Sequence, residues 1–317
     1  MTLRNGKQRD HSACSGCGLC LLACPVWHQT RDIRLTPHGR AKALQHGATA
    51  GEIAASIASC TLCGACAPAC PEEIDLVGMM LDLRRKQPLA PERVAAKMDG
   101  SAKAGVRGGT ASILLLPGEG LRNNTARLAR IVRLLGGGVA VADDDGPDIA
   151  LAVEAGAPLS DQRLASFLSA LRGARRLIVA EGILHRVLRQ WLPGIRVCGV
   201  GEALSALEPV RARLRSSDLY VIEPRAFHGN YARLIGHYDA LRAASGCAMN
   251  LDLQRFAVPT TASSAQNALG LPGINATAQA RCILQGRAVE RIVVEDMADA
   301  AVFASVSRQP VVHLGDV

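Results

Sequence analysis

Two stretches of the sequence carry the same cysteine spacing, C-x2-C-x2-C-x3-C-P, and they use eight of the eleven cysteines. Their members are Cys14, Cys17, Cys20 and Cys24 before Pro25, and Cys60, Cys63, Cys66 and Cys70 before Pro71. Three thiolates at this spacing wrap a short loop around three corners of an iron–sulfur cube, and the fourth leaves on a new segment because proline breaks the backbone path. The repeat therefore predicts two [4Fe–4S] clusters in the first quarter of the chain.

The fourth cysteine of each run is expected to ligate the cluster of the other run, as in two-cluster bacterial ferredoxins. One cluster would then be held by Cys14, Cys17, Cys20 and Cys70, and the other by Cys60, Cys63, Cys66 and Cys24. Because neither run completes its own cluster, the module should fold as one unit coupled to metal loading. Gly16, Gly18 and Gly64 would let backbone N–H groups approach the cluster sulfurs.

Two other uses of these cysteines fit the spacing less well. Structural zinc sites use well separated C-x2-C pairs, so a triple spacing would leave thiolates over. Disulfides are disfavoured in a chain that we expect to be cytoplasmic, because thiols stay reduced there. We therefore assign the eight cysteines to cluster metal and assign no catalytic residue.

The composition indicates two or three domains with an aliphatic core. The 317 residues are 49% apolar but only 3% aromatic, and the formal net charge is +8. The basic excess is spread thinly and is not interleaved with aromatic residues, which argues against nucleic acid as a partner. No apolar run is long enough for a membrane span, and none follows the basic N-terminus as in a signal peptide. We expect a cytoplasmic protein, and its basic surface leaves peripheral association with the inner face of a membrane open.

Residues 1–88 are expected to form a helical domain that holds both cysteine runs. After Pro71, the apolar residues Ile74, Val77, Met80 and Leu81 recur at helical spacing. The segment 89–110 is rich in proline, glycine and small residues, which predicts a linker with one helical turn.

From residue 111 the pattern changes to short apolar strands that alternate with amphipathic helices, which is typical of a parallel α/β sheet. In a first unit, 111–210, we expect strands at 113–117, 138–143, 148–153, 176–180 and 196–201. In a second unit, 211–317, we expect them at 219–224, 247–259 and 291–296. The predicted fold class is an α-helical ferredoxin-type module followed by an α/β region with two repeated parallel-sheet units.

This arrangement resembles the iron–sulfur subunits of glycolate oxidase, anaerobic glycerol-3-phosphate dehydrogenase and heterodisulfide reductase. In those families an α-helical two-cluster ferredoxin domain precedes paired cysteine-rich CCG domains. "TPHGRAKAL" lies where they carry a Pro-Arg-Gly segment, with His38 in place of the arginine. The resemblance covers nearly the whole chain and implies the same order of domains.

The resemblance also implies cysteines after the strands of both α/β units, and this sequence lacks them. The corresponding segments are 116–120, 143–147, 179–182, 222–229, 258–263 and 294–299, and none contains a cysteine. We expect degenerate CCG-like units that keep the fold without the cluster or disulfide chemistry. The isolated Cys198, Cys247 and Cys282 are interpreted as small buried residues.

By this resemblance the chain would be an electron-transfer subunit. It would relay single electrons between a flavoprotein dehydrogenase subunit that contains FAD and a quinone-linked or soluble acceptor, with the α/β region as the dock. A catalytic alternative places a heterodisulfide-reductase-like or nucleotide-binding active site in the α/β region. The missing thiols weigh against the first form, and Glu119 and Asn123 in the glycine-rich turn weigh against the second. A third hypothesis is a scaffold in which the clusters only hold structure.

Two further polar segments have competing interpretations. Asp143, Asp144 and Asp145 could coordinate a divalent cation or form an exposed acidic turn. The segment 223–239 gathers Arg225, His228, Tyr231, His237 and Tyr238, either as a docking or active surface or as part of the core and its rim. We favour the turn and the core.

Overall fold

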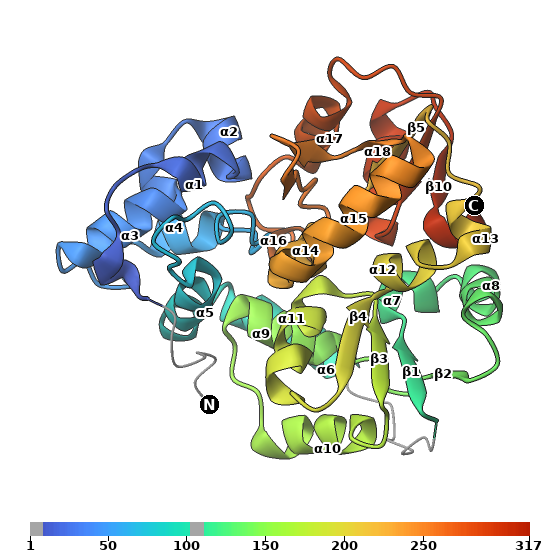
Figure 1. Cartoon of the computed structure of the whole chain (residues 1–317). Coiled ribbons are helices and arrows are strands. Elements are labelled where there is room, and N and C mark those ends of the chain that lie inside the picture. Colours follow the sequence, from blue (N-terminus) through green and yellow to red (C-terminus); the bar gives the residue numbers. More distant parts are fainter. Residues whose placement is uncertain (1–8, 102–110) are drawn as a thin grey trace.

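The computed structural model describes residues 9–101 and 111–317 and has three parts (Figure 1). A small helical module holds both cysteine runs, and two α/β units follow it along the chain. The module lies beside both units. Among the described residues, the helices are all too short or too polar to cross a membrane.

The N-terminal module is built from short helices, as predicted. They are η1 (His11–Ala13), α1 (Leu19–Leu22), α2 (Pro25–Thr30), η2 (Ile33–Leu35), α3 (Pro37–Gln45), α4 (Ala54–Ser59) and α5 (Leu76–Lys86). Proline starts α2 and α3, where a missing N–H costs no helical hydrogen bond. The Thr36 hydroxyl accepts from the Gly39 N–H at 3.2 Å, and Asp75 accepts from the Gly78 N–H at 2.9 Å, so side chains cap α3 and α5.

The predicted linker is more ordered than expected. Helix α6 (Pro91–Ser101) spans eleven residues of it, where one helical turn was predicted. It buries Val94 completely against Leu151 and Ala155 of unit 1. The composition of 89–110 indicated a linker because α6 has few apolar residues, and the tertiary contact stabilises the helix. Residues 102–110 of the predicted linker lie outside the described part of the chain.

The first α/β unit contains a four-stranded parallel sheet in the order β2-β1-β3-β4. Its strands are β1 (Ile113–Leu116), β2 (Val139–Val141), β3 (Arg176–Val179) and β4 (Arg196–Gly199). Its helices are α7 (Gly118–Arg122), α8 (Thr125–Leu135), α9 (Pro147–Ala155), α10 (Asp161–Leu171), α11 (Gly182–Trp191), α12 (Val200–Ser205) and α13 (Glu208–Arg211).

The strand expected at 148–153 is wrong, because these residues form α9. Gly146, with φ of 64°, and Pro147 start this helix. Helix α9 is buried almost all round because α5, α6 and α11 pack against it. A helix buried on every side shows no polar face, so its short apolar run could not be distinguished from a buried strand.

The second α/β unit contains a four-stranded parallel sheet in the order β10-β9-β5-β6. Its strands are β5 (Asp218–Val221), β6 (Ala248–Met249), β9 (Arg291–Val294) and β10 (Val311–His313). Its helices are α14 (Pro224–Gly229), α15 (Tyr231–Ser245), α16 (Ala265–Ala268), α17 (Ala276–Leu284), α18 (Met297–Val306) and η3 (Leu314–Asp316), and β7 (Leu251–Asp252) pairs antiparallel with β8 (Phe256–Ala257). The expected strand at 247–259 is therefore present as three short strands, of which only β6 joins the parallel sheet.

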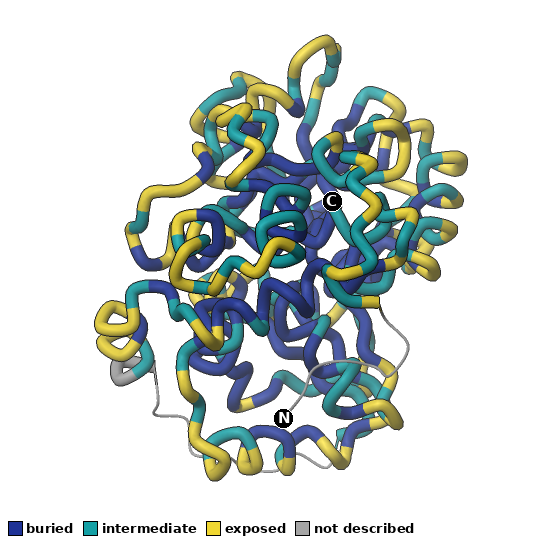
Figure 2. The backbone as a smooth tube through the Cα atoms, turned by 90° about the vertical axis from the view of Figure 1, so that its left-hand side faces the viewer, coloured by how far each residue is buried: buried dark blue, intermediate teal, exposed yellow. Residues whose placement is uncertain are grey.

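One hydrophobic core joins the two α/β units. It contains Leu115 and Ile178 from the first sheet together with Tyr220 and Val293 from the second, and all four are almost completely buried. Figure 2 shows this buried backbone as a continuous dark region through the middle of the molecule. The two sheets therefore form one body, against which the cysteine module packs.

Candidate iron–sulfur site

The eight motif cysteines lie around two cavities within the helical module. Cys14, Cys17, Cys20 and Cys70 line the first, and Cys24, Cys60, Cys63 and Cys66 line the second. Cys24 and Cys70 thus each face the cavity of the other run. This is the grouping that crossed ligation requires, while the ligation itself stays a prediction. We call these two sites the first and the second thiol cavity.

Backbone geometry in the cysteine loops explains the glycines of the motif. Gly16, Gly18 and Gly64 have φ values of 84°, 76° and 79°, a left-handed conformation that side chains with a Cβ adopt with difficulty. At Gly64 a Cβ would also lie 3.0 Å from Cβ of His228 in unit 2. A glycine is therefore needed there both for the turn and for close packing against the α/β region.

Burial raises the pKa of four of the motif thiols, those of Cys20, Cys24, Cys63 and Cys66. Burial and the neighbouring thiols raise the pKa of Cys20 to about 12, and mainly burial raises the pKa of Cys63 to about 12. Such thiols lose their protons only when a metal takes the place of the proton. Two groups of four thiols, each around its own cavity, suit the set of four cysteine ligands that holds a [4Fe–4S] cluster.

Two buried arginines donate hydrogen bonds to backbone carbonyls in and next to the second cysteine run. Arg40 is 1% exposed, and its guanidinium donates to the Ser56 carbonyl at 2.7 Å. Arg84 is completely buried and donates to the carbonyls of Cys60 and Glu154. These buried cations favour the negative charge that cluster-bound thiolates carry. Neither residue was predicted from the sequence, because Arg84 stands in the last turn of α5 beside Arg85 and Lys86, where basic residues are usually exposed.

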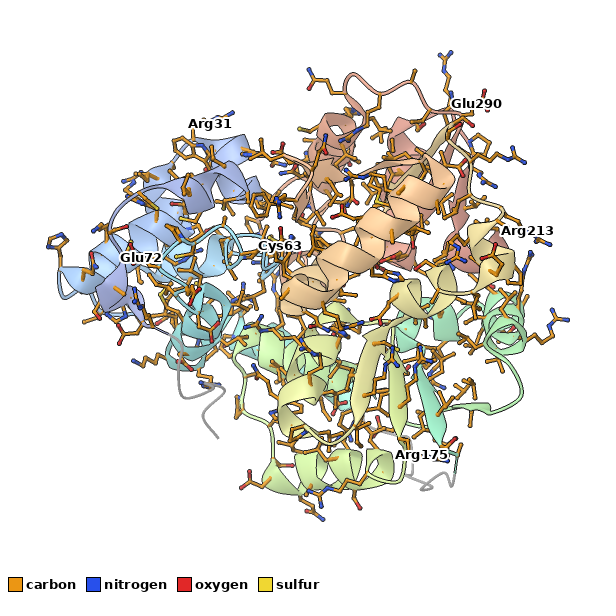
Figure 3. The ribbon with its side chains drawn as sticks, viewed as in Figure 1. Arg31, Cys63, Glu72, Arg175, Arg213 and Glu290 are labelled. Carbon is orange, nitrogen blue, oxygen red and sulfur yellow. The ribbon has the colours of Figure 1, made fainter. Side chains whose placement is uncertain are left out.

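Residues more than 150 positions away hold the loop of the second run. The Gln266 amide donates to the carbonyls of Ala58 and Cys60 at 2.7 and 2.6 Å. His228 contacts the Cys63 carbonyl through Nδ1 at 2.8 Å and the Ala257 N–H through Nε2 at 3.2 Å. Figure 3 shows Cys63 at the boundary between the module and α14. The second thiol cavity is therefore completed by the α/β region.

The two partners of His228 determine its tautomer. The Cys63 carbonyl can only accept, so Nδ1 carries the proton, and the Ala257 N–H can only donate, so Nε2 accepts. Burial lowers the pKa of His228 to about 4, so the ring stays neutral at physiological pH. His228 is buried in the core, as favoured from the sequence, and it links the loop of the second cysteine run to the α/β region.

A second region of interest lies between the two α/β units, at the carboxyl ends of their strands. A cavity of about 370 Å³ there is lined from 117–121, 180–182, 262–264 and 295–298, together with Asn267 and Ala268. These segments overlap four of the six at which the resemblance implied cysteines. The lining instead carries Glu119, Glu181, Glu295 and Asp296 and has no cysteine. We call this site the acidic cavity.

Burial raises the pKa of two carboxyls that line the acidic cavity, those of Glu181 and Glu295. Burial raises the pKa of Glu295 to about 7, although its carboxylate accepts from the hydroxyls of Tyr220 and Tyr238 at 2.6 and 2.7 Å. Arg225 pairs with Glu154 at 3.0 Å and with Glu181 at 3.1 Å. These carboxylates would repel the phosphate of a nucleotide. This agrees with the expectation from the sequence that Glu119 disfavours nucleotide binding.

The remaining predicted groups are accounted for by packing. The exposed acidic turn predicted at 143–145 is wrong for two of its three residues, because Asp144 and Asp145 are buried. Arg163 pairs with Asp144 and Asp148 at 2.7 Å, and Arg122 pairs with Asp145 at 3.0 Å, so these carboxylates make ion pairs. Cys198 and Cys247 are buried, as expected. Cys282 is exposed, so its predicted burial is wrong. Its neighbours Ala280 and Ile283 face the core of unit 2, which leaves position 282 on the outer side of α17.

Comparison with known families identifies part of the chain. A family model described as a 4Fe-4S dicluster domain matches residues 10–74, a range that includes all eight motif cysteines. Residues 10–74 therefore form a ferredoxin-type dicluster domain, which supports an iron–sulfur role in electron transfer. A search of curated proteins gave no match to the chain.

Proposed function

We propose that this protein is an electron-transfer subunit that holds two [4Fe–4S] clusters and relays single electrons between a flavoprotein dehydrogenase subunit and a quinone-linked or soluble acceptor. The grouping of the thiols carries the proposal: four line each of two cavities within one small module. The clusters would supply one-electron chemistry, each accepting and releasing one electron at a time. The chain's own residues bind the clusters, orient their ligands and limit their contact with water.

The residues behind the cysteine loops would tune the two sites differently. In the second run, Arg84 and Gln266 donate to the Cys60 carbonyl, and His228 donates to that of Cys63. In the first run, Lys42 donates to the Cys14 carbonyl at 2.9 Å. Cys24 and Cys63 are more enclosed than Cys17, which is exposed. Buried hydrogen-bond donors and the exclusion of water both change the reduction potential of a cluster. The two clusters should therefore differ in reduction potential, so electrons would pass between them in a preferred direction.

An apolar patch beside the first thiol cavity supports docking of a redox partner. Leu19 and Leu22 of α1 are 44% and 50% exposed, and both lie between cysteines of the first run. Ile33, in η2 of the same module, is 43% exposed. Large aliphatic side chains on a surface often mark contacts with another protein. We propose that the flavoprotein subunit, which would contain FAD, approaches the exposed Cys17 over this patch.

A second candidate function places catalysis in the acidic cavity. It rests on the raised pKa of Glu295, a carboxyl that would exchange a proton near neutral pH. The lack of thiols in the lining argues against a heterodisulfide-reductase-like reaction, and the carboxylates argue against nucleotide binding. If the acidic cavity is catalytic, the two α/β units would resemble CCG domains in their fold but not in their chemistry. Relay remains the function that the observations support best.

The experiment that separates relay from catalysis uses the full chain, purified anaerobically with and without proteins that co-elute with it. We expect the chain alone to bleach reversibly with dithionite and to show no dehydrogenase activity. We expect activity only in fractions that also contain a flavoprotein, and electrons from its substrate should then reduce the clusters. Turnover by the isolated chain would contradict the relay and favour the second candidate.

A further inference from the structure

A large cavity lies where the cysteine module meets both α/β units. Its lining comes from 67–75 of the module, from α11 of unit 1 and from the α14–α15 corner of unit 2. Its volume is about 590 Å³, which lies within the range of small-molecule sites in proteins. We call it the junction cavity. Figure 1 shows α11 and α14, which both contribute to its lining, side by side.

The junction cavity borders the first thiol cavity directly. Cys70 and Ile74 line both cavities. His228, which contacts the loop of the second run, also lines the junction cavity. A molecule in the junction cavity would therefore lie against a ligand of one proposed cluster and close to the loop of the other.

The junction cavity is lined by two arginines and two carboxylates, and only one arginine and one carboxylate of these pair with each other. Arg186 pairs with Asp75 at 3.2 Å. Arg189 donates to the Gly229 carbonyl, but within the part of the chain that the structure describes no carboxylate lies within ion-pair distance of it. Glu73, which also lines the cavity, makes no ion pair with a described arginine. Arg189 is thus a cation that faces the cavity without a carboxylate partner among the described residues.

Glu202, the carboxylate whose charge acts on Arg189, already pairs with Arg233. Glu202 accepts two hydrogen bonds from the Arg233 guanidinium, each of 2.6 Å. Burial, together with the charges of Arg233 and Arg186, lowers the pKa of Arg189. Removing a guanidinium from water next to two like charges costs free energy, and a bound anion would offset that cost.

Two further side chains of the cavity have unused hydrogen-bonding groups. Among the described residues, the Gln190 amide and the Tyr231 hydroxyl have no hydrogen-bond partner, and both side chains line the cavity. The Tyr231 ring is held in place because it stacks near His228 and Phe256, with interplanar angles of 26° and 21°. A fixed hydroxyl and an amide beside a cation are suited to orient a ligand that has polar atoms as well as a charge.

We propose that the junction cavity binds a small organic anion, whose carboxylate or phosphate group pairs with Arg189 and whose body contacts Gln190 and Tyr231. The planar guanidinium of arginine suits both groups because it offers two parallel N–H donors. The cavity favours a small molecule over an acidic protein surface, because it is a hollow of about 590 Å³ whose lining residues come from three separate parts of the chain.

The second part of the inference rests on the proposed function. An anion beside Cys70 would oppose the addition of an electron to the cluster held there, because like charges repel more strongly where water is excluded. Binding should therefore lower the reduction potential of that cluster. By linkage, reduction of the cluster should weaken binding of the anion by the same factor. The fraction of junction cavities that hold the anion would therefore depend on the redox state of that cluster.

The test is calorimetric titration of the full chain, with clusters loaded, using citrate and inorganic phosphate as probes at constant ionic strength. We expect saturable binding of at least one probe, and binding about tenfold weaker in Arg189→Gln because a charge-assisted pair is lost. Arg133→Gln on α8 is the matched control, since Arg133 is exposed and outside the cavity. If Arg189→Gln fails to fold by circular dichroism, Arg189→Lys keeps the charge and should weaken binding less.

Lack of saturable binding of both probes to the unmodified chain would overturn the proposal, as would equal binding by the Arg189 variant. Redox titration with and without citrate then measures the linkage, and we expect a negative shift that Arg189→Gln abolishes. Iron analysis of the same samples distinguishes the two proposals. A chain that loads iron but binds neither anion contradicts only the anion site, whereas a chain that binds anions but loads no iron contradicts only the relay.

Discussion

The thiol cavities and the acidic cavity differ in how their chemistry is encoded. The thiol cavities are built from two short motifs in which spacing alone places the ligands, and the α/β region adds supporting contacts from a distance. The acidic cavity is built from turns after separate strands of two sheets, and its lining is acidic where the resemblance implied sulfur. The comparison teaches that a group of thiols set by local spacing can be predicted from the sequence, whereas the lining of a cavity assembled from separate strands cannot.

The largest expected effect comes from the cysteines that cross between runs. We expect Cys70→Ser to lose or convert the cluster of the first run, and Cys24→Ser to damage that of the second, because each removes one of four thiols from the opposite cavity. Electron paramagnetic resonance with iron analysis measures this. Cys282→Ser, at an exposed thiol outside both cavities, should change neither cluster. Damage confined to the run that carries the substitution would show that ligation is not crossed.

The next largest effect tests whether the α/β region supports the module. Arg84→Met keeps the length of the side chain but removes the hydrogen bonds to the carbonyls of Cys60 and Glu154. We expect the free energy of unfolding to fall by about 3 kcal/mol, since hydrogen bonds from a buried charged group are lost. Anaerobic denaturant titration checks this. The neighbouring Arg85 is exposed and pairs with Asp82, so Arg85→Met should cost much less. Equal losses in the two variants would contradict a special role for Arg84.

A pH-dependent effect separates the acidic cavity from the thiol cavities. Burial raises the pKa of Glu295 from 4.5 to about 7 in the folded chain, so the folded state binds a proton that the unfolded state releases. The stabilisation is present in full below about pH 4.5 and is lost as the pH rises through about 7, with an amplitude of about 3 kcal/mol. Glu295→Gln should reduce the slope of the free energy of unfolding by this amplitude, and Glu223 and Asp299, whose pKa values burial raises to about 8, should account for the slope that remains. An unchanged slope, or a similar change in the exposed Glu208→Gln, would show that Glu295 does not titrate in this range.

The smallest expected effect concerns the histidine between the two regions. His228→Ala leaves the Cys63 carbonyl and the Ala257 N–H without their partner, and we expect a loss of about 1 kcal/mol per hydrogen bond. His228→Asn, which can donate and accept, should recover part of that loss. Redox titration should show a shift only for the cluster of the second run. A shift of both clusters by the same amount would indicate a general loss of packing.

The sequence predicted those features that local spacing determines. The cysteine runs, the helical character of the module and the alternation after residue 111 all depend on neighbours along the chain. The strand expected at 148–153 failed because α9 is buried on all sides and has no polar face to reveal its period. Helix α6 was underestimated because packing against unit 1 stabilises it.

The supporting residues of the candidate site could not be predicted for a related reason. Gln266 lies 206 residues from Cys60, and His228 lies 165 residues from Cys63, so no local pattern connects them. The junction cavity was equally hidden, because Arg189 comes to face a shared cavity only when three parts of the chain meet. Sequence reasoning found the candidate metal ligands, and tertiary structure was needed to find what surrounds them.

The most direct test of the central claim is the iron and acid-labile sulfide content of the full chain, prepared or reconstituted anaerobically. Two complete clusters predict about eight irons and about eight sulfides per chain, with no zinc above background. About four irons per chain, or zinc in place of iron, would contradict the account of two cluster sites built from crossed cysteine runs.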